Sequence, residues 1–385
     1  MEQKKHRIVY ALTLILSVVL VFVGNQIAMG GKQVFGVSNA QDFLRARVLE
    51  VLSVNKNTYD TTTSDTLTIT TITFDARLLT GDQKGKTVRC TQEIDNQFAL
   101  QSPQVKQGDT VLLDRIDGEG EAGKSYLFFE FVRTTPLLIL AVIFAGVVVL
   151  FGRKKGLDTI ISFALTILAI FTVLVPAILT GHNIYLWSLM ICVFIVLTNL
   201  LLVQGVSAKS FTAALGCVCG VIASGLLMLV MDKPMHITGL LDEESIFILQ
   251  LNPSNPINIK ATVFCMILIG SVGALMDVSM SIASALQEIR EKEPQLPPAE
   301  LMRSGFNIGK DMIGTMVNTL VLAYIGGAMS VILLMISYSA NLTQMLNREQ
   351  IAVEILQSLA GSLSVVIAIP LTSFICSIFY KRSAS

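Results

Sequence analysis

Charged side chains are scarce in this sequence. Asp, Glu, Lys and Arg make up 15% of its 385 residues, whereas 52% of the residues are hydrophobic. A soluble protein of this length cannot cover that much apolar surface with polar side chains. Positive and negative charges balance to a net charge of zero, so the distribution of charge along the chain is the informative quantity. The composition predicts an integral membrane protein.

Familiar catalytic and metal-binding motifs are also missing. The sequence contains neither His-Glu-x-x-His nor Gly-x-Ser-x-Gly, and its three histidines are scattered. Five of the six cysteines lie in apolar stretches and are interpreted as small hydrophobic side chains, and Cys90 stands alone in a polar region. We therefore expect no enzyme activity, no bound metal and no cofactor.

Long apolar stretches are what the sequence has in quantity. A hydrocarbon core about 30 Å thick is crossed by about 20 apolar helical residues. Eight stretches satisfy this length and composition: 8–29, 135–152, 157–180, 184–204, 211–231, 259–281, 311–336 and 355–379. They predict an α-helical polytopic membrane protein with about eight transmembrane helices.

Basic residues predict how these spans are oriented. Cytoplasmic loops carry an excess of Lys and Arg, whereas long domains cross the membrane largely regardless of charge. One set of connections holds only three basic residues, Lys233, Lys260 and Arg348, and the other set with the termini holds thirteen: Lys4, Lys5, Arg7, Arg153, Lys154, Lys155, Lys209, Arg290, Lys292, Arg303, Lys310, Lys381 and Arg382. We expect a protein of the cell membrane with both termini in the cytoplasm and residues 32–134 outside.

Residues 32–134 differ in character from the rest of the chain. Five short runs rich in Val, Ile, Thr, Leu and Phe, separated by glycines, occupy 45–54, 66–79, 87–94, 110–115 and 126–132. This pattern predicts a small β-barrel-like, OB-like domain between the first two spans. Basic stripes with interleaved aromatic residues are lacking, so we expect no nucleic acid partner and favour a structural or partner-binding module.

The predicted domains follow from these assignments. Residues 1–31 form an N-terminal anchor helix, 32–134 the exterior β-rich domain and 135–385 a bundle of seven spans. A cleaved secretory signal is the alternative for the first segment. Its apolar run is longer than a signal core of 7–15 residues, and the sequence Gly24-Asn25-Gln26 after it is a poor cleavage site. We therefore favour a retained anchor.

Polar residues recur on one face of the sixth span. Ionisable residues are expensive within a bilayer and usually mark function there. Asp277 lies inside an otherwise apolar run, and a spacing of three or four residues places Gly270, Gly273, Asp277, Ser281, Ser284 and Glu288 on one helical face. This face is expected to meet protein or water and not lipid.

The seventh span adds a second acidic residue at a similar depth. Asp311, Thr315 and Asn318 share one face of that span, and Asp311 begins it near the inner surface where Asp277 is expected. The two carboxylates are predicted to form a cation-binding or proton-binding pair. In the alternative, Asp311 only stabilises the first turn of its helix through the helix macrodipole, and Asp277 lies close enough to the membrane surface to contact water.

Three segments resemble the core of the bacterial YibE/F-like membrane proteins. These are 276–286 (MDVSMSIASAL), 304–320 (SGFNIGKDMIGTMVNTL) and 198–205 (TNLLLVQG), and the match extends over most of residues 135–380. The resemblance implies a multi-pass plasma-membrane protein of bacteria. It supplies no activity and no site residues.

The leading functional hypothesis is a transporter or channel component for a small solute or ion. Its expected ligand-binding residues are Asp277, Ser281, Ser284, Asp311, Thr315, Asn318 and the amide Asn199 on the fourth span. Its expected partners are the lipid bilayer, that solute or ion, and a second copy or a related membrane protein. The competing hypothesis is a non-transporting scaffold or receptor whose exterior domain binds an envelope partner.

Overall fold

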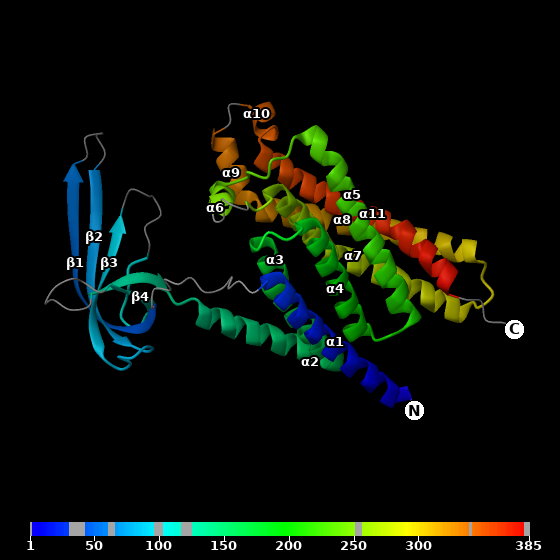
Figure 1. Cartoon of the computed structure of the whole chain (residues 1–385), viewed down its shortest axis with the longest axis horizontal. Helices are drawn as coiled ribbons and strands as arrows, with labels where there is room; N and C mark the ends of the chain where they lie inside the picture. Colours follow the sequence, from blue (N-terminus) through cyan, green and yellow to red (C-terminus); the bar gives the residue numbers. More distant parts are fainter. Residues whose placement is uncertain are drawn as a thin grey trace. The chain divides into compact units, whose positions relative to one another are not determined.

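The computed structural model contains two compact units, which are described separately. One unit takes in residues 35–147, and the other takes in 1–34 together with 148–385. The residues described are 2–30, 43–60, 66–95, 103–116, 125–250, 256–338 and 341–380. In Figure 1 the strands are blue to cyan, and the second unit contains the blue N-terminal helix together with the helices drawn from green to red.

The first unit holds a closed five-stranded barrel. Its strands are β1 (Leu44–Asp60), β2 (Thr66–Leu78), β3 (Thr87–Asp95), β4 (Thr110–Ile116) and β5 (Ser125–Phe131), in the order β1-β2-β3-β5-β4. Neighbouring strands are antiparallel except β3 and β5, which are parallel. The predicted small β-barrel is confirmed.

Alternation of side chains builds the core of this barrel. Along β2 the buried residues are Ile72, Phe74, Ala76 and Leu78, every second position, as expected of a strand with one face inward. Gln92 is a polar exception that is 1% exposed. Its side-chain nitrogen donates to the carbonyl oxygen of Pro103 at 3.0 Å, and its oxygen accepts from the backbone N–H of Val105 at 3.0 Å.

Helices make up most of the rest of the described chain. They are α1 (Glu2–Met29), α2 (Thr134–Ala169), the π-helix η1 (Ile170–Leu174), α3 (Val175–Leu179), α4 (Ile184–Gln204), α5 (Ala208–Met235), α6 (Glu243–Gln250), α7 (Ile259–Lys292), α8 (Pro298–Gly327), α9 (Met329–Tyr338), α10 (Leu342–Leu346) and α11 (Glu349–Phe379). Within the described residues, six helical stretches are long and apolar enough to cross a membrane, and α8 with α9 is a further candidate bent by 62°. The predicted number of eight is therefore not confirmed.

The difference in number arises largely at Arg153. The predicted second and third spans fall within one apolar helical stretch, Thr134–Leu179. Arg153 interrupts that stretch with a non-helical backbone, φ 50° and ψ −124°. A Cβ added at Gly156 would collide with the carbonyl oxygen of Val148, so the backbone before and after Arg153 packs closely and only glycine fits there.

Close helix contacts form the core of the helical unit. In α5, a Cβ added at Gly216 would collide with Thr372 of α11, and one added at Gly220 would lie 2.5 Å from Leu275 of α7. Small residues at such positions let helices approach closely. The Tyr380 hydroxyl, just after α11, donates to the carbonyl oxygen of Ala283 in α7 at 2.9 Å. Figure 1 shows α7, α8 and α11 side by side.

The structure corrects the prediction for the seventh span. A span over 311–336 was expected, with Asp311 at its beginning. Instead α8 is one helix from Pro298 to Gly327, and the bend before α9 falls inside the predicted span. Gly326 and Gly327 are the last residues of α8, and glycine has the lowest helix propensity after proline, which favours a break there.

Candidate functional site

Asp277 lies on the outward face of α7. The opposite face, with Leu275, Val278 and Ile282, is buried in the bundle. Asp277 and Ser281 are exposed on the surface of the single chain, and Ser284 is half-buried. The polar stripe predicted from spacing therefore exists, and its central residues Gly273, Asp277 and Ser281 are exposed in the single chain.

α8 carries the second polar face. Asp311, Thr315 and Asn318 are all exposed, and the Thr315 hydroxyl donates to the carbonyl oxygen of Met312 at 3.0 Å. Because α8 begins at Pro298, Asp311 lies more than three turns inside the helix. The explanation that Asp311 stabilises a first helical turn is therefore wrong, since the macrodipole effect is confined to that turn.

Two contacts set the relative depth of these acidic residues. At one end Gly305 of α8 lies against Leu286 of α7, and at the other Tyr324 of α8 lies against Gly270 of α7. Interpolating between the two contacts along antiparallel helices places Asp277 level with Thr315, and Asp311 level with Ser281. The levels of the two carboxylates thus differ by about four residues, or ~6 Å.

The two carboxylates do not bond to each other. Neither Asp277 nor Asp311 makes a hydrogen bond or ion pair with any residue that the structure describes. Each lies opposite the side on which its own helix packs into the bundle. Across the same described residues, no group of three or more His, Cys, Asp or Glu side chains is arranged to hold a metal.

Asn199 lies apart from these residues. It is half-buried on α4, a helix that packs against α1, α5 and α7. Its neighbour Thr198 lies with its hydroxyl oxygen 3.3 Å from that of Ser17 in α1. This part of α4 therefore contacts the N-terminal helix, and the structure does not join Asn199 to the polar face of α8.

Sequence reasoning missed a further acidic residue beside α8. Glu354 of α11 is half-buried and lines a pocket of about 210 Å³ together with Tyr324 and Ser358. The Tyr324 hydroxyl is buried beside the Gln357 side chain. The signal that identifies this pocket is the spacing of Glu354, Ser358 and Ser362, which places three polar groups on one face of an apolar helix.

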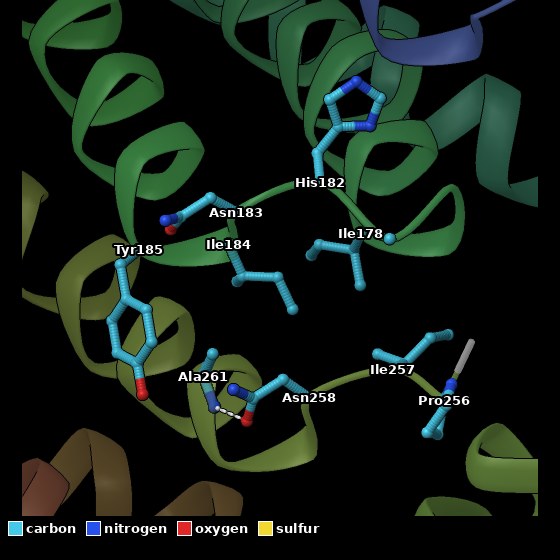
Figure 2. A pocket seen from close by; sticks show the side chains of 10 residues that line it. Ile178, His182, Asn183, Ile184, Tyr185, Pro256, Ile257, Asn258 and Ala261 are labelled. Carbon is cyan, nitrogen blue, oxygen red and sulfur yellow. Dashed lines mark hydrogen bonds between the residues drawn. The ribbon is translucent and has the colours of Figure 1, made fainter.

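A separate cavity lies where α4 and α7 begin. It measures about 350 Å³, and its polar lining side chains are His182, Asn183, Tyr185 and Asn258. Figure 2 shows the Asn258 side chain bonded to the backbone N–H of Ala261, while the His182 ring points away from the cavity. Asn183 caps α4 in the same way, by accepting from the backbone N–H of Leu186.

The histidine at this cavity is engaged as well. The Thr180 hydroxyl donates to a backbone carbonyl, that of Ala28 or that of Pro176, both at 2.8 Å. His182 Nδ1 shares a hydrogen bond of 2.8 Å with the same hydroxyl, Thr180 Oγ1. Three of the four polar side chains thus stabilise local structure, so the candidate site remains on α7 and α8.

Comparison with protein families gives one match. The sequence model of a family described as YibE/F-like protein matches residues 140–382. That range takes in α7, α8 and α11, and the resemblance predicted from the sequence motifs is confirmed. No curated protein and no solved structure matches the chain.

Proposed function

We propose that this chain, which belongs to the YibE/F-like family, is a transporter or channel component. Its apolar helices carry acidic residues that have no partner among the described residues. It moves a small solute or cation across the plasma membrane. The proposal includes the predicted topology of about eight spans, with both termini in the cytoplasm and the barrel outside at the outer mouth. The basic residues gathered on one set of connections support that orientation.

The observation that carries this proposal is the uncovered polar face of α7 and α8. Asp277 is exposed on α7, which is long and apolar enough to cross a membrane, and Asp311 is exposed on α8, which meets that test only together with α9. Neither residue has a partner among the described residues. Carboxylates at such positions are costly and usually serve ions or protons. In our proposal Asp277 and Asp311 bind the cation or proton.

Neighbouring oxygen atoms complete the proposed coordination. Ser281 lies level with Asp311, and Thr315 lies level with Asp277, by the helix contacts described above. Asn318 lies two turns deeper on α8 than Asp311. These hydroxyl and amide oxygens suit a hard cation such as Na⁺ or a hydrated solute. Ser284 lies further along the same stripe of α7, and Asn199, on α4, lies apart from this set.

Flux measurement on carboxamide variants tests this function. In proteoliposomes, Asp277→Asn and Asp311→Asn are each expected to lower cation-driven or proton flux at least about tenfold, because the amide cannot hold the ionic charge. Glu288→Gln is the matched control, since Glu288 ends the same stripe but pairs with Lys292 at 2.7 Å. Normal flux in both aspartate variants contradicts the proposal.

A specific feature of the barrel favours a second function, the binding of an envelope partner. Phe43 and Phe129 are both exposed and their ring centroids lie 4.3 Å apart. Exposed aromatic pairs are typical of protein interfaces. If the chain is such a scaffold, deletion of residues 43–131 removes a co-purifying partner, and liposomes containing the full chain show no flux. Neither function requires an enzyme activity.

A further inference from the structure

The outward face of α8 carries a repeat of its own. On the inward side, Gly305 and Gly309 are buried against Ser373 and Ile369 of α11. On the opposite side, alternate steps of four and three residues join Asn307, Asp311, Gly314, Asn318, Val321 and Ile325. All of these except the half-buried Val321 are exposed. A step that averages 3.5 residues is the pattern of a helix that packs against another helix along its whole length.

This face needs a polar cover within the membrane. Asp311 and Asn318 lie on this side of α8 within the predicted span 311–336. A carboxylate and a carboxamide there cost free energy against lipid, because acyl chains offer no hydrogen bonds. A Cβ built at Gly314 meets no atom within 4 Å. The centre of the face is therefore open. A small residue at this position lets a second membrane helix approach closely.

We propose that a second copy of this chain covers this face, with the two α8 helices parallel and side by side about a two-fold axis. Both copies enter the membrane in the same direction, so residues with the same number lie at the same depth. A two-fold interface must be complementary to itself, since the same patch is used by both partners. The α8 face meets that demand in its charges and in its amides.

The charges are complementary because opposite signs are adjacent. Lys310 and Asp311 are both exposed, and neither forms an ion pair with any residue that the structure describes. Across a two-fold axis, Lys310 of each copy meets Asp311 of the other, so the dimer contains two equivalent ion pairs. An unrelated membrane protein would have to supply this same doublet in the reverse arrangement.

The amides are complementary by their chemistry. A carboxamide has both a donor and an acceptor, so Asn307 and Asn318 each bond to the same residue of the second copy. Polar residues at such seam positions also fix the register and the number of helices in an assembly. One consequence reaches the proposed site: Asp311 and Asn318 of both copies then lie along one axis, with Lys310 of the second copy beside each Asp311 carboxylate.

Disulfide trapping tests the contact directly. The full chain with Gly314→Cys, in membranes and under mild oxidation, is expected to give a covalent dimer, since seam positions of paired helices fall within the 4.4–6.8 Å reach of a disulfide. The matched control is Thr319→Cys, also exposed on α8 but turned out of the seam. The chain without added cysteine gives the background. Equal trapping at both positions, no trapping at either, or trapping to a different protein overturns the proposal.

Exchange of the charges provides a second test that does not depend on one variant folding. Lys310→Asp alone places four acidic groups around the axis and is expected to weaken dimerisation about tenfold or more, measured as the dimer dissociation constant in bilayers. Lys310→Asp combined with Asp311→Lys restores opposite neighbours and is expected to restore the dimer. A double variant as weak as the single one counts against the interface.

The interface and the proposed function fail separately. Trapping at Gly314→Cys in a chain that shows no flux retains the interface and removes the transport function. Flux that depends on Asp311 in a chain that never forms the dimer retains the function and removes the interface.

Discussion

Single residues in this protein show how burial determines chemistry. Arg290, at the end of α7, is 7% exposed and donates through Nη1 to the carbonyl oxygens of Pro294 and Leu296 at 3.1 and 2.7 Å. A buried guanidinium that holds two carbonyls fixes the turn between α7 and α8. From the sequence, Arg290 was interpreted only as one of the positive charges on the cytoplasmic side, because a charge pattern along the chain carries no information on burial.

Cys90 gives a prediction at the same scale. Burial, with a smaller contribution from the Asp75 carboxylate, raises the pKa of the Cys90 thiol to about 12. Below the ordinary thiol pKa of about 8.5, the thiol is neutral in the folded and unfolded chain alike. At higher pH the unfolded chain loses this proton first. The barrel is therefore expected to lose up to about 1.4 kcal/mol of stability per pH unit as the pH rises from 8.5 towards 12.

Hydrogen exchange of β3, corrected for intrinsic rates, measures this loss between pH 8 and 10. The matched control is Cys90→Ala, which cannot ionise and should lack this part of the slope. Identical slopes for the two chains would show that the Cys90 thiol does not titrate as described.

Helices and strands were predictable where their hydrophobic pattern along the sequence is unambiguous. The strands of the barrel and helices α4, α5, α7 and α11 lie close to their expected ranges, since alternation and long apolar runs are local signals. The helix of the seventh span was expected to begin near Asp311, whereas α8 begins at Pro298. Residues 298–310 are polar and were not expected to belong to the same helix. They continue α8 through contacts with α11 at Gly305 and Gly309, and no local window of sequence records that packing.

The same limit applies to the candidate site. Helical spacing correctly placed Asp277 with Ser281, and Asp311 with Thr315 and Asn318, because residues three or four apart share a face. It could not show that both faces point out of the bundle, which depends on where α11 packs. Glu354 was missed because the predicted eighth span began one residue after it. Tyr324, which lines the same pocket, belongs to a different helix.

Helix packing gives a prediction at the scale of elements. A Cβ at Gly309 would collide with the side chain of Ile369, which is 2% exposed. Gly309→Ala is therefore expected to lower the free energy of unfolding by about 1–3 kcal/mol through overpacking between α8 and α11. Thermal unfolding of the purified chain in detergent measures the effect.

The control for that variant is Gly273→Ala in α7. A Cβ at Gly273 meets no atom within 4 Å, and alanine has the higher helix propensity. We expect an unchanged or slightly raised melting temperature for this variant. A loss equal to that of Gly309→Ala would show that packing against Ile369 does not explain the destabilisation.

At the scale of the whole molecule, the distribution of charge predicts orientation. The cluster Arg153, Lys154 and Lys155 interrupts an apolar helical stretch of 46 residues. Basic clusters next to spans stay in the cytoplasm. A reporter that is active only in the cytoplasm is expected to give signal when fused after Ser385 and none when fused after Phe131, and a reporter active only outside should give the reverse.

Removal of that cluster is the matched test of cause. Replacement of Arg153, Lys154 and Lys155 by serine weakens the preference of that loop for the cytoplasm. A mixed signal is therefore expected from a reporter inserted after Phe131 of the full chain. A fully reversed signal in the unaltered chain would contradict the orientation and would place the barrel in the cytoplasm.

The two glycines that end α8 act as a joint. Gly326 and Gly327 have no atom within 4 Å of an added Cβ, so side-chain crowding does not resist rotation there. The walls of the pocket around Glu354 come from both sides of this joint, with Tyr324 and Ile325 before it and Ala328 and Ile332 after it. Any change in the angle between α8 and α9 therefore widens or narrows the space beside the Glu354 carboxylate.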